Sequence, residues 1–304
     1  MKKYFIFTVD TEGDNLWAWK EGKSITTENS KCLPKFQELC DVCGIKPVYL
    51  TNYEMLLDTG CVNFLKQSHL TAKCEIGMHI HAWNTPPHYE LNNVYGGNAY
   101  ITEYPYDIMK SKADFLKSKL EEVFETDIIS HRSGRWATDE RYLHVLKEIG
   151  IKVDCSYTPG LDLSHIPGYS QKNGNDYRNV PMSVFQPIEG LYEVPMTTRR
   201  IRSWGSGTLK HRIKTFLFGK DVWCRPIDRS VDFLCQLERS VAKEAECNHI
   251  EMMIHSSELM PGGSPYFKTA EDIQALYDTM KAFFEYILEK GYIPVTFKEY
   301  LKIH

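Results

Sequence analysis

Short apolar runs and longer amphipathic segments alternate along this chain of 304 residues. Runs rich in β-branched and aromatic residues predict strands, and apolar residues at three- and four-residue spacing predict helices. We expect strands at residues 3–10, 46–52, 72–81, 127–131, 152–157, 191–196, 250–255 and 292–297. We expect helices at residues 30–43, 53–57, 105–124, 139–149, 227–247 and 269–290.

This alternation predicts an α/β fold with a parallel sheet, because helices that connect successive parallel strands cover the sheet. The turns from helix to strand are short and carry a glycine, as at Gly44 and Gly150. Seven or eight such units favour a distorted (β/α) barrel, closed or nearly closed, over an open doubly wound sheet. In such barrels the active site lies at the carboxyl ends of the strands.

The whole chain, residues 1–304, is predicted to form a single domain. Two stretches, 84–104 and 159–187, are rich in Gly, Pro, Asn and aromatic residues and predict long loops over one face. Neither resembles a linker between domains.

Composition indicates an ordinary soluble globular protein, with 42% apolar residues, 25% charged residues and a formal net charge of −4. Nucleic acid is therefore not an expected partner. The amino terminus becomes acidic at Asp10, too early for a signal peptide, and no apolar run approaches membrane-spanning length.

The nine cysteines are scattered and odd in number, which favours free thiols and a cytoplasmic location. Cys40 and Cys43 form a CxxC, but no second CxxC follows to complete a tetrathiolate metal site. We expect them to be structural thiols.

Titratable residues end three of the predicted strands. His79 and His81 are two residues apart, which places both imidazoles on one face of an extended segment. Asp10 and Glu12 have the same spacing after the first strand, and His255 ends a later one. Because the carboxyl ends of parallel strands meet at one edge, these side chains predict a metal site.

Five segments resemble the motifs of the polysaccharide deacetylase family and occur in the same order: FTVDTEGD, EIGMHIHAW, SHRSGRWATDE, KVDCSY and MMIHSSEL. Proteins of this family contain the NodB homology domain and are a type of carbohydrate esterase. The resemblance extends from the first strand to His255. It implies a distorted (β/α) barrel that removes N- or O-acetyl groups from sugars with a divalent metal.

The resemblance gives Asp10 the role of the general base that acts on water. The family's second aspartate, a metal ligand, is replaced here by Thr11. Glu12 lies on the same face as Asp10 and is a candidate for that ligand position. The opposite assignment, in which Asp10 binds metal and Glu12 is the base, stays open.

His79 matches the family's first metal histidine. The second is normally four residues later, where this chain has Trp83, so His81 is the natural replacement. One carboxylate and two imidazoles form a suitable site for zinc, the expected metal, and would also accept other first-row metals.

Arg132 matches the family arginine that orients the base, since a guanidinium keeps a nearby carboxylate ionised. His255 matches the late histidine that protonates the leaving group. Asp154 lies near the position of the aspartate that tunes this histidine, and Glu258 is an alternative local partner.

Aromatic residues are plentiful, with 6 Trp and 18 Tyr, and several lie next to the motifs. Trp83 and Trp136 are candidates for stacking on a sugar ring, with packing roles as the alternative. Arg135 is a candidate for substrate binding, with an exposed loop position as the alternative.

The stretch from Arg199 to Arg225 carries many basic residues with aromatic residues between them. It predicts either a solvated insertion or a surface that binds a lipid-linked glycan precursor, a sugar nucleotide or a membrane.

The sequence thus predicts a metal-dependent hydrolase that deacetylates a sugar or glycan precursor. Two alternatives remain open. One is an amidase that acts on a non-sugar C–N bond, and the other is an inactive glycan-binding relic of the same fold. The identity of the sugar, the atom that carries the acetyl group and the oligomeric state stay open as well.

Overall fold

The computed structural model describes residues 2–171, 173–201, 209, 217, 219–228, 230–244 and 246–303. Within them, the main sheet has the strand order β10–β1–β2–β3–β4–β5–β7–β6, and β11 also pairs with β1. Every pairing is parallel except that of β6 with β7. The strands are β1 (Lys3–Thr11), β2 (Val48–Thr51), β3 (Glu75–Ile80), β4 (Ser130–Ser133), β5 (Val153–Asp154), β6 (Phe185–Ile188), β7 (Leu191–Glu193), β10 (His249–His255) and β11 (Tyr292–Pro294).

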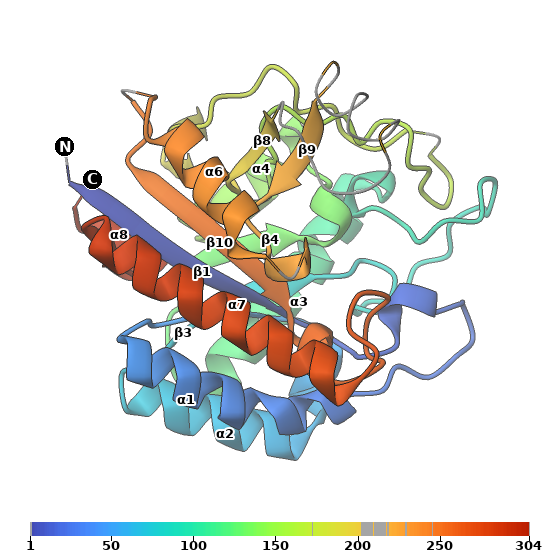
Figure 1. Cartoon of the computed structure of the whole chain (residues 1–304). Helices are drawn as coiled ribbons and strands as arrows, with labels where there is room; N and C mark the ends of the chain where they lie inside the picture. The colour runs from blue at the N-terminus through green and yellow to red at the C-terminus, as the bar shows by residue number, and fades with distance from the viewer. Residues whose placement is uncertain are drawn as a thin grey trace.

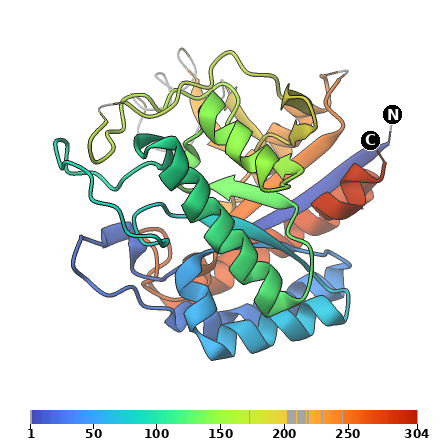
Figure 2. The ribbon, with the colours of Figure 1, turned by 180° about the vertical axis from the view of Figure 1, so that it is seen from behind.

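Helices cover the outer side of this curved sheet. In Figure 1, α1, α2 and α7 lie together along one side, whereas α6 lies near β8 and β9. Figure 2 shows the green helices α3 and α4 from behind, and both views place the two termini side by side. The helices are α1 (Leu33–Cys43), α2 (Thr59–Leu70), α3 (Tyr106–Phe124), α4 (Glu140–Glu148), α6 (Val231–Val241), α7 (Ala270–Glu289) and α8 (Phe297–Leu301).

Alternation along β1 divides the core into two apolar clusters. Phe5 and Phe7 belong to the larger cluster between sheet and helices, where Phe7 packs against Phe284 of α7. Tyr4 and Ile6 belong to a smaller cluster with residues of β2 and β5. Because successive side chains of a strand point to opposite faces, the smaller cluster fills the inside of the barrel.

Among the described residues, the main sheet does not close into a complete barrel, because its edge strands β6 and β10 do not pair. A separate hairpin leads into a residue that hydrogen-bonds to β10. The hairpin consists of the antiparallel strands β8 (Thr198–Ile201) and β9 (Lys220–Trp223). Cys224 follows β9, and its N–H donates to the carbonyl of Thr197 at 2.9 Å. The carbonyl of Cys224 accepts from the N–H of Met253 on β10 at 3.0 Å.

Strand register brings the candidate residues together. Asp10 on β1 pairs with His255 on β10, and His79 on β3 pairs with Arg132 on β4. The carboxyl ends of these strands therefore meet at one end of the barrel, as the sequence predicts.

The eight predicted strands are all present, and most are shorter than expected. The predicted helix at 53–57 is a single 3-10 turn. Helix α2 was missed, because it buries only the narrow stripe of Cys61, Leu65 and Ser68. Its start is nevertheless marked by Asp58, which accepts from the N–H groups of Gly60 and Cys61.

The predicted loops are confirmed in outline. Residues 84–104 contain only a short 3-10 turn, Ile101–Glu103. The described part of the stretch 159–187, which leaves out residue 172, contains one isolated bridge and the start of β6. The basic stretch is anchored by β8 and β9, a hairpin that the sequence did not predict. Its residues Arg202, Lys210, Arg212 and Lys214 lie outside the described residues.

All nine cysteines are free thiols. Burial raises the pKa of Cys40 well above its usual range, as expected for a structural thiol, and Cys43 is only partly buried. Among the described residues, no helix is both long enough and apolar enough to cross a bilayer.

Replacement of Phe284 tests the packing of the outer cluster. Phe284 is fully buried and contacts the rings of Phe5 and Phe7, so Phe284→Ala should lower the free energy of unfolding by about 3–5 kcal/mol. Leu288→Ala on the same helix is the control, since Leu288 is 36% exposed and should cost less. Urea denaturation measures both, and equal losses would contradict this account of the core.

Candidate active site

The strand ends enclose a cavity of about 380 Å³ at the carboxyl end of the barrel. Asp10, Glu12, His79, His81 and His255 all line it. The inner face of β1 changes from apolar to polar toward this end, from Tyr4 and Ile6 to Thr8 and Asp10. The same strand therefore supplies both the barrel core and part of the cavity.

Three buried side chains converge on one point of this cavity. One carboxylate oxygen of Glu12 lies 3.3 Å from Nε2 of His79 and 3.2 Å from Nε2 of His81. The two Nε2 atoms are 3.1 Å apart. Among the described residues, this is the one group of at least three His, Cys, Asp or Glu residues whose ligand atoms lie close enough to hold a metal ion.

The donor set of this triad fits a divalent metal. Atoms that bind a tetrahedral zinc at about 2.0–2.2 Å lie roughly 3.3–3.5 Å from each other, close to the separations seen here. Nδ1 of His79 lies 3.0 Å from the carbonyl oxygen of Arg132. Because a carbonyl only accepts, Nδ1 carries the proton and Nε2 keeps a free lone pair for a metal.

The turn after β1 holds Glu12 in place. Its N–H donates to the hydroxyl of Ser256 at 3.0 Å, and its carbonyl accepts from the side-chain amide of Asn29 at 2.8 Å. Burial would raise the pKa of Glu12, but neighbouring His255, His79 and His81 lower it well below its usual range. Glu12 is thus ionised and fixed against the two imidazoles.

Gly134 allows the turn after β4 to approach His81. A Cβ atom at this position would lie 2.4 Å from Cδ2 of His81 and 2.6 Å from the carbonyl oxygen of Ile80. No side chain larger than hydrogen fits there, so the glycine sets the close packing behind the imidazole.

Arg132 is fully buried between two carboxylates. Its Nη1 donates to Asp10 at 2.6 Å and to the hydroxyl of Thr8 at 3.0 Å, and its Nη2 donates to Glu251. Burial alone would raise the pKa of Asp10, but the charges of Arg132, His79 and His255 together bring it below its usual value. At Glu251 burial outweighs the nearby charges, and the pKa is raised to about 7.

His255 faces the carboxylates of Asp10 on β1 and of Glu12 in the turn that follows. Its Nε2 lies 3.9 Å from Asp10 and 4.0 Å from Glu12. On the other side of the ring, Nδ1 lies 3.0 Å from Nη2 of Arg225 and 3.8 Å from a carboxylate oxygen of Glu258. Arg225 also donates to Glu258 at 2.5 Å, so these two residues form a buried ion pair on the Nδ1 side of the imidazole.

Asp154 does not contact His255, which corrects the expected pairing. Its carboxylate lies 2.9 Å from Nδ1 of His131 and accepts from the hydroxyl of Ser156 at 2.6 Å. Its neighbours Val153 and Cys155 belong to the cluster inside the barrel, so Asp154 points outward. Glu258, the alternative local partner, is the carboxylate beside His255.

The three residues expected to bind substrate all line the cavity. Trp83 stacks on His81, with ring centroids 4.2 Å apart. Trp136 lies over the guanidinium of Arg132 at 5.1 Å. Arg135 donates to the carbonyls of Asn98 and Pro167, and therefore ties the two long loops together.

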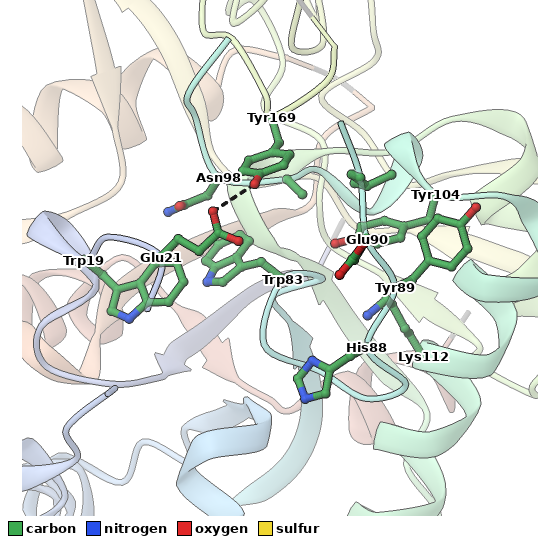
Figure 3. A pocket seen from close by; sticks show the side chains of 12 residues that line it. Trp19, Glu21, Trp83, His88, Tyr89, Glu90, Asn98, Tyr104, Lys112 and Tyr169 are labelled. Carbon is green, nitrogen blue, oxygen red and sulfur yellow. Dashed lines mark hydrogen bonds between the residues drawn. The ribbon is translucent and has the colours of Figure 1, made fainter. Parts of the chain in front are cut away.

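A second cavity of about 620 Å³ adjoins the first, and the two share Trp83 and Asn98 as lining residues. Figure 3 shows its aromatic, acidic and basic side chains pointing inward from several segments, with Tyr169 bound to Glu21. Its lining consists of Trp19, Glu21, Trp83, His88, Tyr89, Glu90, Leu91, Asn98, Ala99, Tyr104, Lys112 and Tyr169.

Lys112 of α3 is buried beside this second cavity, with 1% of its surface exposed. Its Nζ donates to the carbonyls of Thr85 and Pro87 at 2.7 and 2.6 Å and lies 4.8 Å from the ring centre of Tyr104. Burial lowers the pKa of Lys112 to about 8.

Two charged residues of the site, Glu251 and Arg225, could not be recognised from the sequence. Glu251 is a single carboxylate inside an apolar strand, a pattern that indicates a buried partner. Arg225 belongs to the basic stretch and gave no separate signal. Its contact with His255 depends on how the hairpin packs against β10.

No protein-family model matches this chain, and no curated protein sequence does. Solved structures do match. The Xyl-CE4 domain of a multidomain xylanase from the hindgut metagenome of Trinervitermes trinervoides is 10% identical with a TM-score of 0.48, covering 100% of this chain and 91% of that chain. A CE4 family pseudoenzyme from Bacillus anthracis is 11% identical with a TM-score of 0.48, and the match covers 98% of this chain and 65% of that chain.

A GH57 branching enzyme from Thermococcus kodakaraensis superposes with a TM-score of 0.56 at 12% identity, covering 99% of this chain and 71% of that enzyme. The chain shares its fold with this enzyme. Proteins of the CE4 family are also among the structures that it resembles. Identities this low show the fold alone, so function must be argued from the site.

Replacement of Arg132 tests the buried charge network. Arg132→Met leaves two buried carboxylates unpaired and should lower the free energy of unfolding by about 3–5 kcal/mol. Arg178→Met is the control, because Arg178 pairs with Asp176 at the surface with 58% of its side chain exposed, and it should cost under about 1 kcal/mol. A similar small loss for both variants in urea denaturation would contradict the network.

Lys112 gives a prediction about pH. Its folded pKa, about 8, lies below the usual value of 10.5, so the unfolded chain binds more protons between these values. The free energy of unfolding of the wild type, relative to Lys112→Met, should therefore rise by up to about 3 kcal/mol between pH 8 and 10.5. Urea denaturation at several pH values measures this difference. If the difference stays constant or falls as the pH rises, the lowered pKa of buried Lys112 is wrong.

Proposed function

We propose that this protein is a metal-dependent hydrolase that removes an acetyl group from a sugar or glycan precursor. The observation that carries the proposal is the triad of Glu12, His79 and His81 in one cavity with Asp10 and His255. The site thus offers a metal position, a base and a second proton-carrying group within a few ångströms of each other.

Glu12, His79 and His81 would hold the metal, and zinc is the expected ion. A divalent cation bound there would lower the pKa of water and polarise the acetyl carbonyl. Glu12 is assigned as the ligand because its oxygen lies beside both Nε2 atoms. The assignment of Glu12 as base, left open by the sequence, is less well supported.

Asp10 is proposed as the general base. Its lowered pKa and its 2.6 Å ion pair with Arg132 keep it ionised and able to accept the proton of water. Arg132 fixes the position of that carboxylate without lining the cavity. Arg132 is therefore a positioning residue in this mechanism.

His255 is proposed to donate the proton that the departing nitrogen or oxygen of the sugar requires. Its Nε2 lies 3.9 Å from the carboxylate of Asp10 on the neighbouring strand, and both side chains line the cavity, so a bound substrate would lie beside both groups. Glu258 and Arg225 position the ring from behind. Asp154 has no part in this step.

A sugar substrate is supported by the walls of the cavity. Trp83, Trp136 and Trp223 expose aromatic surface to it, together with the donors and acceptors of Arg135 and Asn98. Ligand pockets combine apolar surface with a few polar groups in this way. A cytoplasmic location and contact with a lipid-linked substrate remain predictions.

Metal analysis combined with acetate release tests the proposal. Purified wild-type protein should hold about one divalent ion per chain and release acetate from acetylated sugars, whereas His79→Ala/His81→Ala should lose both. Asp10→Asn should retain the metal but lose at least about 100-fold in kcat. His144→Ala is the control, because His144 is exposed on α4.

The outcome also separates the alternatives. Metal without acetate release, but with hydrolysis of non-sugar amides or cyclic imides, would indicate the amidase. Absence of metal even after addition of zinc, nickel and cobalt would overturn the metal-dependent mechanism and favour a metal-independent amidase or the glycan-binding relic.

A further inference from the structure

We propose that Glu54, in the turn that follows β2, is a positioning residue that connects the turn carrying Glu12 with the turn carrying His81 and so sets the geometry of the metal site. The inference rests on the proposed function, because that function depends on this metal site. Glu54 lies outside the triad of possible metal ligands and does not line the cavity beside it.

The order of the strands explains why such a connection is needed. The triad comes from the ends of β1 and β3, and β2 lies between these two strands in the sheet. β2 ends at Thr51 and supplies no member of the triad. The segment that follows β2 therefore lies between the two ligand-bearing turns.

Both oxygens of the Glu54 carboxylate take part in the connection. Oε1 accepts at 2.8 Å from the backbone N–H of Gly13, which follows Glu12 in the chain. Oε2 accepts from the side-chain amide of Asn84 at 2.7 Å. Asn84 is in turn held beside β3, because its N–H donates to the carbonyl of His81 at 3.3 Å. One buried carboxylate, 6% exposed, thus connects one ligand-bearing turn to the other.

Asn52 forms a second connection between the same two turns. Its N–H donates to the carbonyl of Thr11, at the end of β1, at 3.0 Å. Its side-chain oxygen accepts from the N–H of Tyr53 at 2.7 Å and lies 3.5 Å from the backbone nitrogen of His81. The carboxylate of Glu54 is therefore one part of a connection that the backbone also supports.

The turn at Gly13 is packed on its other side as well. A Cβ atom at this position would lie 2.2 Å from Cγ2 of Ile25 and 3.0 Å from the carbonyl oxygen of Thr26. Gly13 is thus enclosed between this segment and the carboxylate of Glu54. Removal of the carboxylate would leave a buried N–H without its acceptor and let the turn shift, together with Glu12. Groups that hold metal ligands in place in this way typically contribute about 10- to 100-fold to metal affinity.

Zinc affinity and the cobalt spectrum test this role. Glu54→Leu should weaken zinc binding by at least about tenfold, measured by competition with a chelator. The Co²⁺-loaded variant should also show a changed d–d absorption spectrum, since this spectrum reports the arrangement of the ligands.

Glu54→Gln separates geometry from charge. The buried Oδ1 of Asn84 has no hydrogen-bond partner among the described residues, so a reversed Asn84 amide would accept from the new side-chain amide of Glu54→Gln. This variant can therefore keep both hydrogen bonds. It should retain the wild-type cobalt spectrum, and any loss of zinc affinity would report the lost charge alone.

Glu238→Leu is the matched control. Glu238 on α6 is also a buried carboxylate, 3% exposed, and it accepts from the hydroxyls of Tyr286 and Tyr292 at 2.8 and 3.1 Å. Its loss should lower stability without a change in zinc affinity or cobalt spectrum. Asn84→Ala, at a half-buried position, keeps the test valid if Glu54→Leu does not fold. It should weaken zinc binding by about three- to tenfold, the contribution of one hydrogen bond.

The outcomes separate this inference from the proposed function. Wild-type zinc affinity and cobalt spectrum in Glu54→Leu and Asn84→Ala would overturn the positioning role and leave the hydrolase intact. The same spectral change in Glu54→Gln as in Glu54→Leu would overturn it too, because both hydrogen bonds can persist in Glu54→Gln.

A wild type that binds no metal would overturn the proposed function, and amide hydrogen exchange then decides on the connection. Faster exchange of both segments 10–16 and 79–86 in Glu54→Leu, but not in Glu238→Leu, supports it. Exchange that is unchanged, or raised equally in Glu238→Leu, overturns it.

Discussion

The guanidinium group of Arg132, buried between the carboxylates of Asp10 and Glu251, is the interaction on which this end of the barrel depends. It connects strands β1, β4 and β10 across the interior, where water cannot compensate for a lost charge. The same residue also acts through its backbone, since its carbonyl accepts from Nδ1 of His79. One residue therefore orients both the candidate base and a candidate metal ligand.

Sequence was most informative where local periodicity determines the structure. The spacing of two between Asp10 and Glu12, and between His79 and His81, predicts that each pair shares one face of extended backbone. In the structure Asp10 and His79 lie on β1 and β3, and Glu12 and His81 follow directly after these strands. Parallel connections then bring these strand ends to one edge. The same rule explains the error at Asp154, because Val153 and Cys155 occupy the inner face of β5 and leave Asp154 on the outer one.

Features that depend on distant contacts could not be predicted. The hairpin β8–β9 is fixed by hydrogen bonds of Cys224 to Thr197 and Met253, which lie 27 or more positions away along the chain. Arg225 reaches His255 only because of this arrangement. The second cavity likewise requires two long loops to meet, and neither loop shows a periodic pattern from which their contact could be deduced.

The paired spacing of the site has a consequence for how such a protein can change over evolutionary time. Side chains on a strand reverse direction with every added or deleted residue. A one-residue insertion between Asp10 and Glu12, or between His79 and His81, would turn one member of the pair away from the cavity even if every residue type were retained. Replacing the residue between the two members of a pair, Thr11 or Ile80, preserves this alternation, whereas adding or deleting a residue there does not. Lineages that keep this chemistry should therefore conserve these two intervals more strictly than the identities of the residues between them.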